Sequence, residues 1–187
     1  MTVQVANKDP KSEVNIEVKS DDDTSFEPIS GWPNVETKNE TEVVAKFIVP
    51  LLDKLNFSEN DRHFELPISM KTGVSKKPGR IDVGLFARDK KKLDGRVLLI
   101  VEAKSPRIRL KEKQADQIES YAHNTYSHFG LLTNGKEIIV YHFPVGMKPK
   151  EVFNCKKEEL HEKRLSKLSS IISKAALVKH YNGFAND

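Results

Sequence analysis

The sequence contains a single cysteine, Cys155, and lacks a long apolar run, a signal-like N-terminus and a phosphate-binding loop. One cysteine forms no internal disulfide and offers no cysteine-based metal site. No run approaches the roughly 18 apolar residues that span a bilayer. Gly73 to Gly79 lacks the Gly-Lys-Ser/Thr ending of a nucleotide-binding loop, which excludes a motor. Without a basic start followed by an apolar stretch, no secretory signal is expected, and we expect a cytoplasmic protein with no membrane partner.

Charge is unevenly distributed along the 187 residues, whose net charge is +4 and whose pI is about 9.0. Residues 1–38 hold eight acids against four lysines, a balance of −4, which leaves about +8 on the remainder. A basic body suits a polyanionic partner. A lysine-rich surface that only aids solubility would give the same number, so charge alone does not decide.

Composition divides the chain into a polar, acidic extension (1–38) and one folded domain (39–187). We expect the extension to be disordered or loosely packed, with Trp32 docking on the body. The domain is predicted to hold a helix over 39–57, strands over 63–68, 80–86 and 97–103, a helix over 110–124, strands over 129–133 and 137–143, and an amphipathic helix over about 157–177. This order predicts an α/β sandwich.

The first predicted helix begins at Asn39, a good N-cap. Its apolar residues form one stripe at helical spacing, and Pro50 should bend it. Four residues before Val44, Glu40 falls on that inward stripe, whereas Glu42 falls on the other side. An inward acid is either functional or interacts with the helix dipole, and Glu42 aligns almost as well.

Three charged residues stand in two segments that read as strands: Asp82, then Glu102 and Lys104 at the end of an apolar run. Because strand side chains alternate, Glu102 and Lys104 share one face. Burying such charges is costly unless they are paired or bind an ion. Asp82 and Glu102 can hold a divalent ion, with the Ala103 carbonyl as a natural third ligand. Lys104 would orient or deprotonate an attacking water, and these alternatives remain open.

The motif resembles the signature of the PD-(D/E)xK nuclease superfamily: Asp82 is followed, after nineteen intervening residues, by Glu102-Ala103-Lys104. The similarity is closest to the N-terminal nuclease domain of type I restriction-enzyme R subunits and covers roughly residues 39–143. It includes Gln117-x-x-x-Tyr121 in the helix over 110–124, then two further segments, Leu131 to Gly135 and Ile138 to Tyr141.

The resemblance implies a restriction-endonuclease-like sandwich, with a mixed sheet of about five strands flanked by helices. It implies an Mg²⁺-dependent DNA endonuclease in which Mn²⁺ substitutes. Glu40 would complete the metal shell, and Gln117 and Tyr121 would contact the nucleic-acid backbone or support the site. In that family the domain is fused to a helicase motor and acts with specificity and methylation subunits, so this chain is either free-standing or works with separately encoded motor or specificity subunits. A homodimer is left open.

Cations that suit DNA phosphates cluster in the loop that follows the predicted strand over 97–103. Arg107, Arg109 and Lys111 lie there. Arg80, two residues before Asp82, either binds the phosphate or forms a salt bridge to Asp82.

Three alternatives compete with the nuclease. The charged triad can be a structural ion-pair network, or the fold can be a catalytically silent DNA-binding or assembly module. RNA as the substrate also stays open. The six histidines show no metal-binding spacing and are assigned no catalysis.

Overall fold

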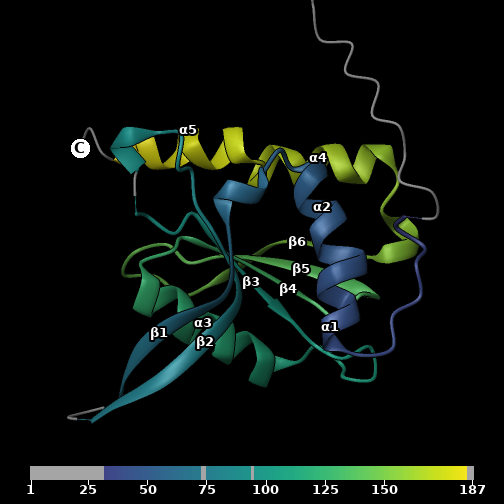
Figure 1. The fold of residues 1–187 in the computed structure, drawn as a ribbon, viewed down its shortest axis with the longest axis horizontal. Helices are drawn as coiled ribbons and strands as arrows, with labels where there is room; N and C mark the ends of the chain where they lie inside the picture. Colours follow the sequence, from purple (N-terminus) through teal and green to yellow (C-terminus); the bar gives the residue numbers. More distant parts are fainter. Residues whose placement is uncertain (1–31, 73–74, 94, 185–187) are drawn as a thin grey trace, which may run out of the picture.

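The sheet contains six strands, arranged in chain order (Figure 1). The computed structural model describes residues 32–72, 75–93 and 95–184. The strands are β1 (Arg62–Thr72), β2 (Ser75–Leu85), β3 (Leu99–Ala103), β4 (Phe129–Thr133), β5 (Glu137–His142) and β6 (Lys150–Lys156). Neighbours pair antiparallel except for β3 and β4, which run parallel and are joined through α3 (Glu112–Thr125).

The mixed sheet of about five strands is confirmed, with β6 as the strand that the sequence did not predict. In β6, Phe153 and Cys155 are buried, Val152 is partly buried and the other residues are exposed. An edge strand with lysines at both ends gives a weak alternating pattern. The five predicted strands are all present, and β1 and β2 extend further than expected into a long hairpin.

Helices cover both faces of the sheet, so the predicted α/β sandwich is confirmed. On one face, Ile118 and Ala122 of α3 pack with Ile100 and Leu132 of the central strands. The other face is covered by the N-terminal helix and by two C-terminal helices, which Figure 1 shows crossing above the sheet. Every residue of β3 is buried, as its continuous apolar run predicts.

The N-terminal helix is divided into α1 (Glu40–Glu42), the π-helix η1 (Val43–Ile48) and α2 (Val49–Lys54). Asn39 caps it as predicted, accepting a hydrogen bond from the Glu42 N–H at 2.9 Å. Pro50 has no N–H, and the preceding Val49 N–H donates to the carbonyl of Val44, five residues back. The expected disturbance at Pro50 is therefore a widened helix turn, and the helix ends three residues earlier than residue 57.

Residues 1–31 of the predicted polar extension lie outside the described residues. Trp32 docks on the body as expected: its Nε1 donates to the Phe47 carbonyl at 3.2 Å and its ring stacks on Phe47. Lys54 lies over the same ring. This contact anchors the chain just before the domain begins.

The single helix predicted over 157–177 is wrong. The structure has the 3₁₀ turn η4 (Lys157–Glu159), then α4 (Glu162–Ile172) and α5 (Lys174–Phe184). Ser173 between them is extended, and its hydroxyl accepts a hydrogen bond from the Ala176 N–H at 3.3 Å. A serine that caps a new helix competes with continuation of the old one. Two further 3₁₀ turns are present: η2 (Glu59–Asp61) precedes β1, and η3 (Lys91–Leu93) lies between β2 and β3.

Candidate active site

The predicted charged residues converge from three elements at one end of β3. Asp82 lies on β2, Glu102 and Ala103 on β3, and Lys104 directly after β3. The Asp82 carboxylate accepts a hydrogen bond from the Ala103 N–H at 2.6 Å. This bond holds the Asp82 side chain against the backbone between Glu102 and Lys104. Glu40 of α1 reaches the same place, with its carboxylate 3.9 Å from the Lys104 ammonium.

Glu102 is the buried centre of this group, with 3% of its surface exposed. Its Oε1 accepts from the Lys104 ammonium at 2.5 Å and from the Gln117 amide at 2.8 Å. Its Oε2 is buried and has no hydrogen-bond partner. Burial first, and then the negative charge of Asp82, raises the pKa of Glu102 to about 7. A buried carboxylate oxygen without a partner is rare in folded proteins and calls for an explanation.

The Asp82 carboxylate is also destabilised as an anion. Burial raises its pKa, and the Ala103 N–H and the charge of Lys104 only partly offset this. Two neighbouring carboxylates whose pKa values are both raised form a site that a cation would stabilise. Their oxygen chemistry, with the Ala103 carbonyl between Glu102 and Lys104, fits Mg²⁺, which takes one or two carboxylates together with waters.

Within the described ranges, no group of three or more histidine, cysteine or acidic side chains is arranged to hold a metal ion. The fit to a divalent ion therefore rests on two carboxylates. Glu40 as a third ligand stays a prediction, since its side chain is 48% exposed.

The choice between Glu40 and Glu42 is decided by their contacts. Glu42 turns away from the site: it accepts from the Lys38 N–H at 3.1 Å and from the Lys46 ammonium at 3.0 Å. Glu40 faces the site, where burial raises its pKa while the charge of Lys104 lowers it. The sequence left this choice open, and the contacts favour Glu40, whose role stays a prediction.

Lys104 keeps its proton in this arrangement. Burial alone lowers the pKa of its ammonium, but the hydrogen bond and charge of Glu102, with the charges of Glu40 and Asp82, outweigh burial and raise it overall. A protonated Lys104 can orient a water or neutralise negative charge, but it cannot accept a proton. Of the two roles left open by the sequence, the geometry favours the first.

Gln117 and Tyr121 support the acid from α3. They lie one turn apart, and the Gln117 amide donates both to Glu102 and to the Tyr121 hydroxyl, the latter at 2.9 Å. Tyr121 is only 8% exposed. Among the described residues these contacts hold Glu102 in place, which favours the supporting role over direct contact with nucleic acid.

Arg80 pairs with Glu65 across the β1–β2 hairpin at 3.1 Å. Both side chains are about two-thirds exposed. The salt bridge between Arg80 and Asp82 that the sequence left open is therefore not the observed pairing, although the charge of Arg80 still lowers the pKa of Asp82.

The loop after β3 carries exposed cations and is tied to the β4–β5 turn. The Asn134 amide donates to the Ile108 carbonyl at 2.8 Å, while its carbonyl accepts from the N–H groups of Lys136 and Glu137. The predicted tight turn is present, with Gly135 at φ 74°. A shallow cavity of about 590 Å³ lies there, and its lining includes four cations, Arg107, Arg109, Lys136 and Lys156.

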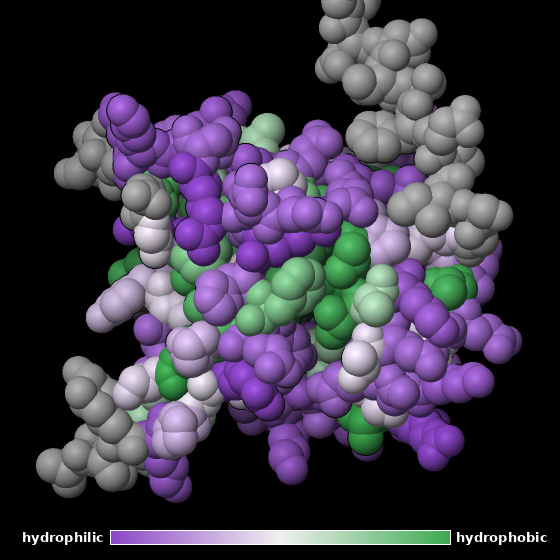
Figure 2. All heavy atoms as spheres, in the orientation of Figure 1, coloured by the Kyte–Doolittle hydropathy of each residue, from purple (hydrophilic) through white to green (hydrophobic). Residues whose placement is uncertain are grey.

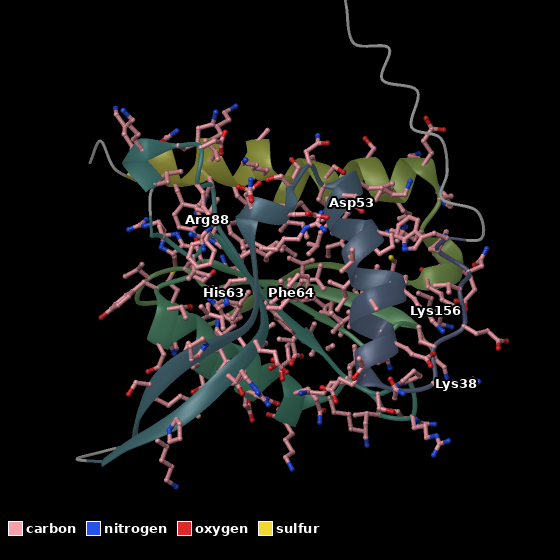
Figure 3. The ribbon with its side chains drawn as sticks, viewed as in Figure 1. Lys38, Asp53, His63, Phe64, Arg88 and Lys156 are labelled. Carbon is pink, nitrogen blue, oxygen red and sulfur yellow. The ribbon has the colours of Figure 1, made fainter. Side chains whose placement is uncertain are left out.

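Lys136 and Lys156 were missed by the sequence reasoning. Lys136 follows β4 and Lys156 ends β6. Both are far from β3 along the chain, so only the fold brings them beside Arg107 and Arg109. Figure 3 labels Lys156 toward the right-hand edge of the view. The predicted cation Lys111 lies on the same loop as Arg107 and is exposed.

A family model described as the N terminus of the type I restriction enzyme R protein (HSDR_N) matches residues 39–170. The chain belongs to this family. The match includes every proposed site residue of this R-protein N-terminal domain, from Glu40 to Tyr121, and ends within α4. No curated protein sequence matches the chain.

Two solved structures resemble this R-protein N-terminal domain. One is a fragment of a putative HsdR subunit of a type I restriction enzyme from Vibrio vulnificus YJ016, with a TM-score of 0.46 and 19% identity, covering 73% of this chain and 27% of that one. The other is a DrdV–DNA complex, with a TM-score of 0.47 and 17% identity, covering 74% and 12%. The chain thus spans about a quarter or less of the length of these neighbours. No helix of the described residues is long and apolar enough to cross a membrane.

Proposed function

We propose that this R-protein N-terminal domain is an Mg²⁺-dependent DNA endonuclease of restriction type. The observation that carries the proposal is the buried Oε2 of Glu102, which has no partner and lies in a group with Asp82 and Lys104. Asp82, Glu102 and the Ala103 carbonyl would hold the ion, with Glu40 beside them, and Mn²⁺ would substitute. When bound there, the ion would supply Lewis-acid stabilisation of the phosphate and lower the pKa of water.

The residues of the chain have separate tasks in this proposal. Lys104, protonated and within reach of both Glu102 and Glu40, orients the attacking water and neutralises charge that develops on the phosphate. Gln117 fixes the Glu102 carboxylate, and Tyr121 fixes Gln117. Such positioning holds the reacting groups in one geometry, which is a large part of catalysis.

DNA would approach over the cations beside the site. The loop after β3 carries Arg107, Arg109 and Lys111. The same basic surface is extended by Lys136 and Lys156. Phosphate contacts from such side chains give affinity without sequence recognition. Separately encoded motor or specificity subunits would direct the cut, or the chain would act as a free-standing relative.

The test incubates the wild-type chain and Lys104→Ala with supercoiled plasmid, linear duplex, single-stranded DNA and RNA, each with Mg²⁺, Mn²⁺ or EDTA. Lys92→Ala, which removes an exposed lysine on η3, is the matched control. We expect metal-dependent cutting of DNA by the wild type and the control, and none by Lys104→Ala.

The second candidate is a DNA-binding or assembly module that does not cut. The exposed basic surface around Arg107 and Lys156 favours it, because that surface needs no metal ion to hold DNA. Salt-sensitive DNA binding that is the same in EDTA, with no cutting by the wild type, would replace the nuclease with this module.

A further inference from the structure

A groove of mixed character, lined by apolar side chains and by the acids Glu40, Glu65 and Asp82, opens onto the site. It measures about 580 Å³ and lies between the N-terminal helix and the β1–β2 hairpin. Val44 and Val49 line its helical wall, and Phe64 lines the wall formed by the hairpin. Asp82 and Glu40 line it too, so the groove and the proposed active site share residues. Figure 2 shows a patch of hydrophobic atoms between these elements, on the face of the molecule drawn there.

Phe64 is the aromatic residue of this groove, and 46% of it is exposed. Because Phe64 also lines the groove, its exposed ring is available to a ligand that enters there. Figure 3 shows Phe64 beside the strand pair, on the side of the N-terminal helix. Among the described residues, Phe64 belongs to neither buried cluster.

The backbone next to Phe64 is strained. Glu65 has φ 53°, a left-handed conformation that is unfavourable for a residue with a side chain. Phe64 pairs with Val83 and Leu66 with Ile81, so the unpaired Glu65 lies opposite Asp82. Strain of this kind persists where the surroundings enforce it and is concentrated at functional sites. The π-helix on the other wall of the groove is a second irregularity, also frequent at functional sites.

The chemistry of the groove suits a nucleobase of the strand being cut. A base and its phosphate are joined by one sugar, so a phosphate held at Asp82 brings a base within reach of the groove. The volume is within the range of about 300–1,000 Å³ for small-molecule pockets, and the walls offer an aromatic face. Arg80, also in the lining, pairs with Glu65 at 3.1 Å and would have to exchange that partner for the adjoining phosphate.

We propose that this groove holds an unstacked base of the substrate strand, stacked on Phe64, next to the phosphodiester that reacts at Asp82. The inference rests on the proposed nuclease function and adds a recognition element to it. A base fully paired in a duplex cannot enter the groove, so the domain prefers single-stranded, unwound or flipped nucleotides at the point of cutting.

The test compares two probes: a short single-stranded oligothymidine, and the same sugar–phosphate strand with every base removed. Binding is measured by fluorescence anisotropy with Ca²⁺, a hard cation that oxygen ligands also take. The full chain is used as wild type, Phe64→Ala, Phe64→Leu and Phe64→Tyr. Met147→Ala, which removes an apolar side chain that is 63% exposed, is the matched control.

We expect the wild type, Phe64→Tyr and Met147→Ala to bind the strand with bases about tenfold more tightly than the strand without them. Phe64→Ala and Phe64→Leu should bring that ratio close to one and leave affinity for the base-free strand unchanged. Leucine keeps an apolar side chain and removes only the ring, which separates stacking from loss of folding.

A ratio that stays near tenfold in Phe64→Leu overturns the proposal, because the base is then held elsewhere. The proposal is also overturned if the wild type binds the strands with and without bases equally well. A protein partner is then the remaining occupant for the groove. If plasmid cutting with Mg²⁺ persists in either case, the nuclease stands and only the base pocket fails. If the wild type neither binds nor cuts any DNA, the proposed function fails and the base pocket with it.

Discussion

Replacing Glu102 by glutamine should stabilise the metal-free protein while removing its response to Mg²⁺. The ionised Glu102 carboxylate is 3% exposed, and its Oε2 has no partner. Its pKa rises from the ordinary 4.5 to about 7 in the folded chain. At about 1.4 kcal/mol per pKa unit, this corresponds to a penalty of about 3 kcal/mol on the free energy of folding at pH 8. Glutamine removes the charge and keeps an oxygen for Gln117, so we expect a gain of about 1–2 kcal/mol after relaxation.

The gain should depend on pH in a definite direction. The folded chain holds the Glu102 proton more tightly than the unfolded chain does, so this group favours folding at low pH. Its contribution is lost as the pH rises from 4.5 to about 7. The difference in unfolding free energy between Glu102→Gln and the wild type should therefore fall below about 1 kcal/mol at pH 5 and be largest at pH 8.

The assay is urea unfolding in EDTA at both pH values, followed by melting temperatures with and without Mg²⁺. Ligand that binds only the folded state raises the melting temperature, so Mg²⁺ should stabilise the wild type and leave Glu102→Gln unchanged. Glu119→Gln, which neutralises a partly exposed acid of α3, is the control. If Glu102→Gln is less stable than the wild type in EDTA, Glu102 belongs to a structural ion-pair network, and the argument for a metal site is refuted.

Three further predictions concern other parts of the chain. Lys174→Met should cost about 2–3 kcal/mol in urea unfolding, because Lys174 pairs at 2.9 Å with Asp61, which is 1% exposed; a loss below about 0.5 kcal/mol would contradict this. Burial lowers the pKa of His180 to about 4, so the unfolded chain binds its proton first, and stability should fall as the pH drops from 6.5 to 4. His180→Phe should reduce that fall, and an unchanged pH profile would count against it. Lys156→Ala should reduce the slope of log affinity against log salt for duplex DNA by about 1; an unchanged slope would place Lys156 off the DNA surface.

The sequence was sufficient where the signal is local. The run that ends at Glu102 is apolar on both faces, which placed it at the centre of the sheet, and its burial confirms this. Helix phase favoured Glu40 over Glu42 without deciding between them, and the contacts of Glu42 with Lys38 and Lys46 supply the difference. The Asn134-Gly135 turn was equally readable, since few residue pairs suit that conformation.

The sequence was insufficient where the structure depends on contacts across the fold. The cap at Ser173 is a weak local signal, because serine also occurs inside helices, and the N–H of Lys174 finds its acceptor on Leu55, far away in the chain. The left-handed Glu65 is invisible for the same reason: glutamate has no preference for positive φ, and the hairpin imposes it. Lys136 and Lys156 join the basic surface only after β4, β5 and β6 have paired.

Energetics also separate the two candidate functions. A protein that only holds DNA needs exposed cations, such as Arg107 and Lys156, and gains nothing from an acid buried beside another acid. Here Glu102 and Asp82 both have raised pKa values, and Gln117 and Tyr121 are engaged in keeping Glu102 in that unfavourable position. Stability is given up at a site where a divalent cation would recover it. This arrangement favours the proposed metal site over a module that only binds DNA.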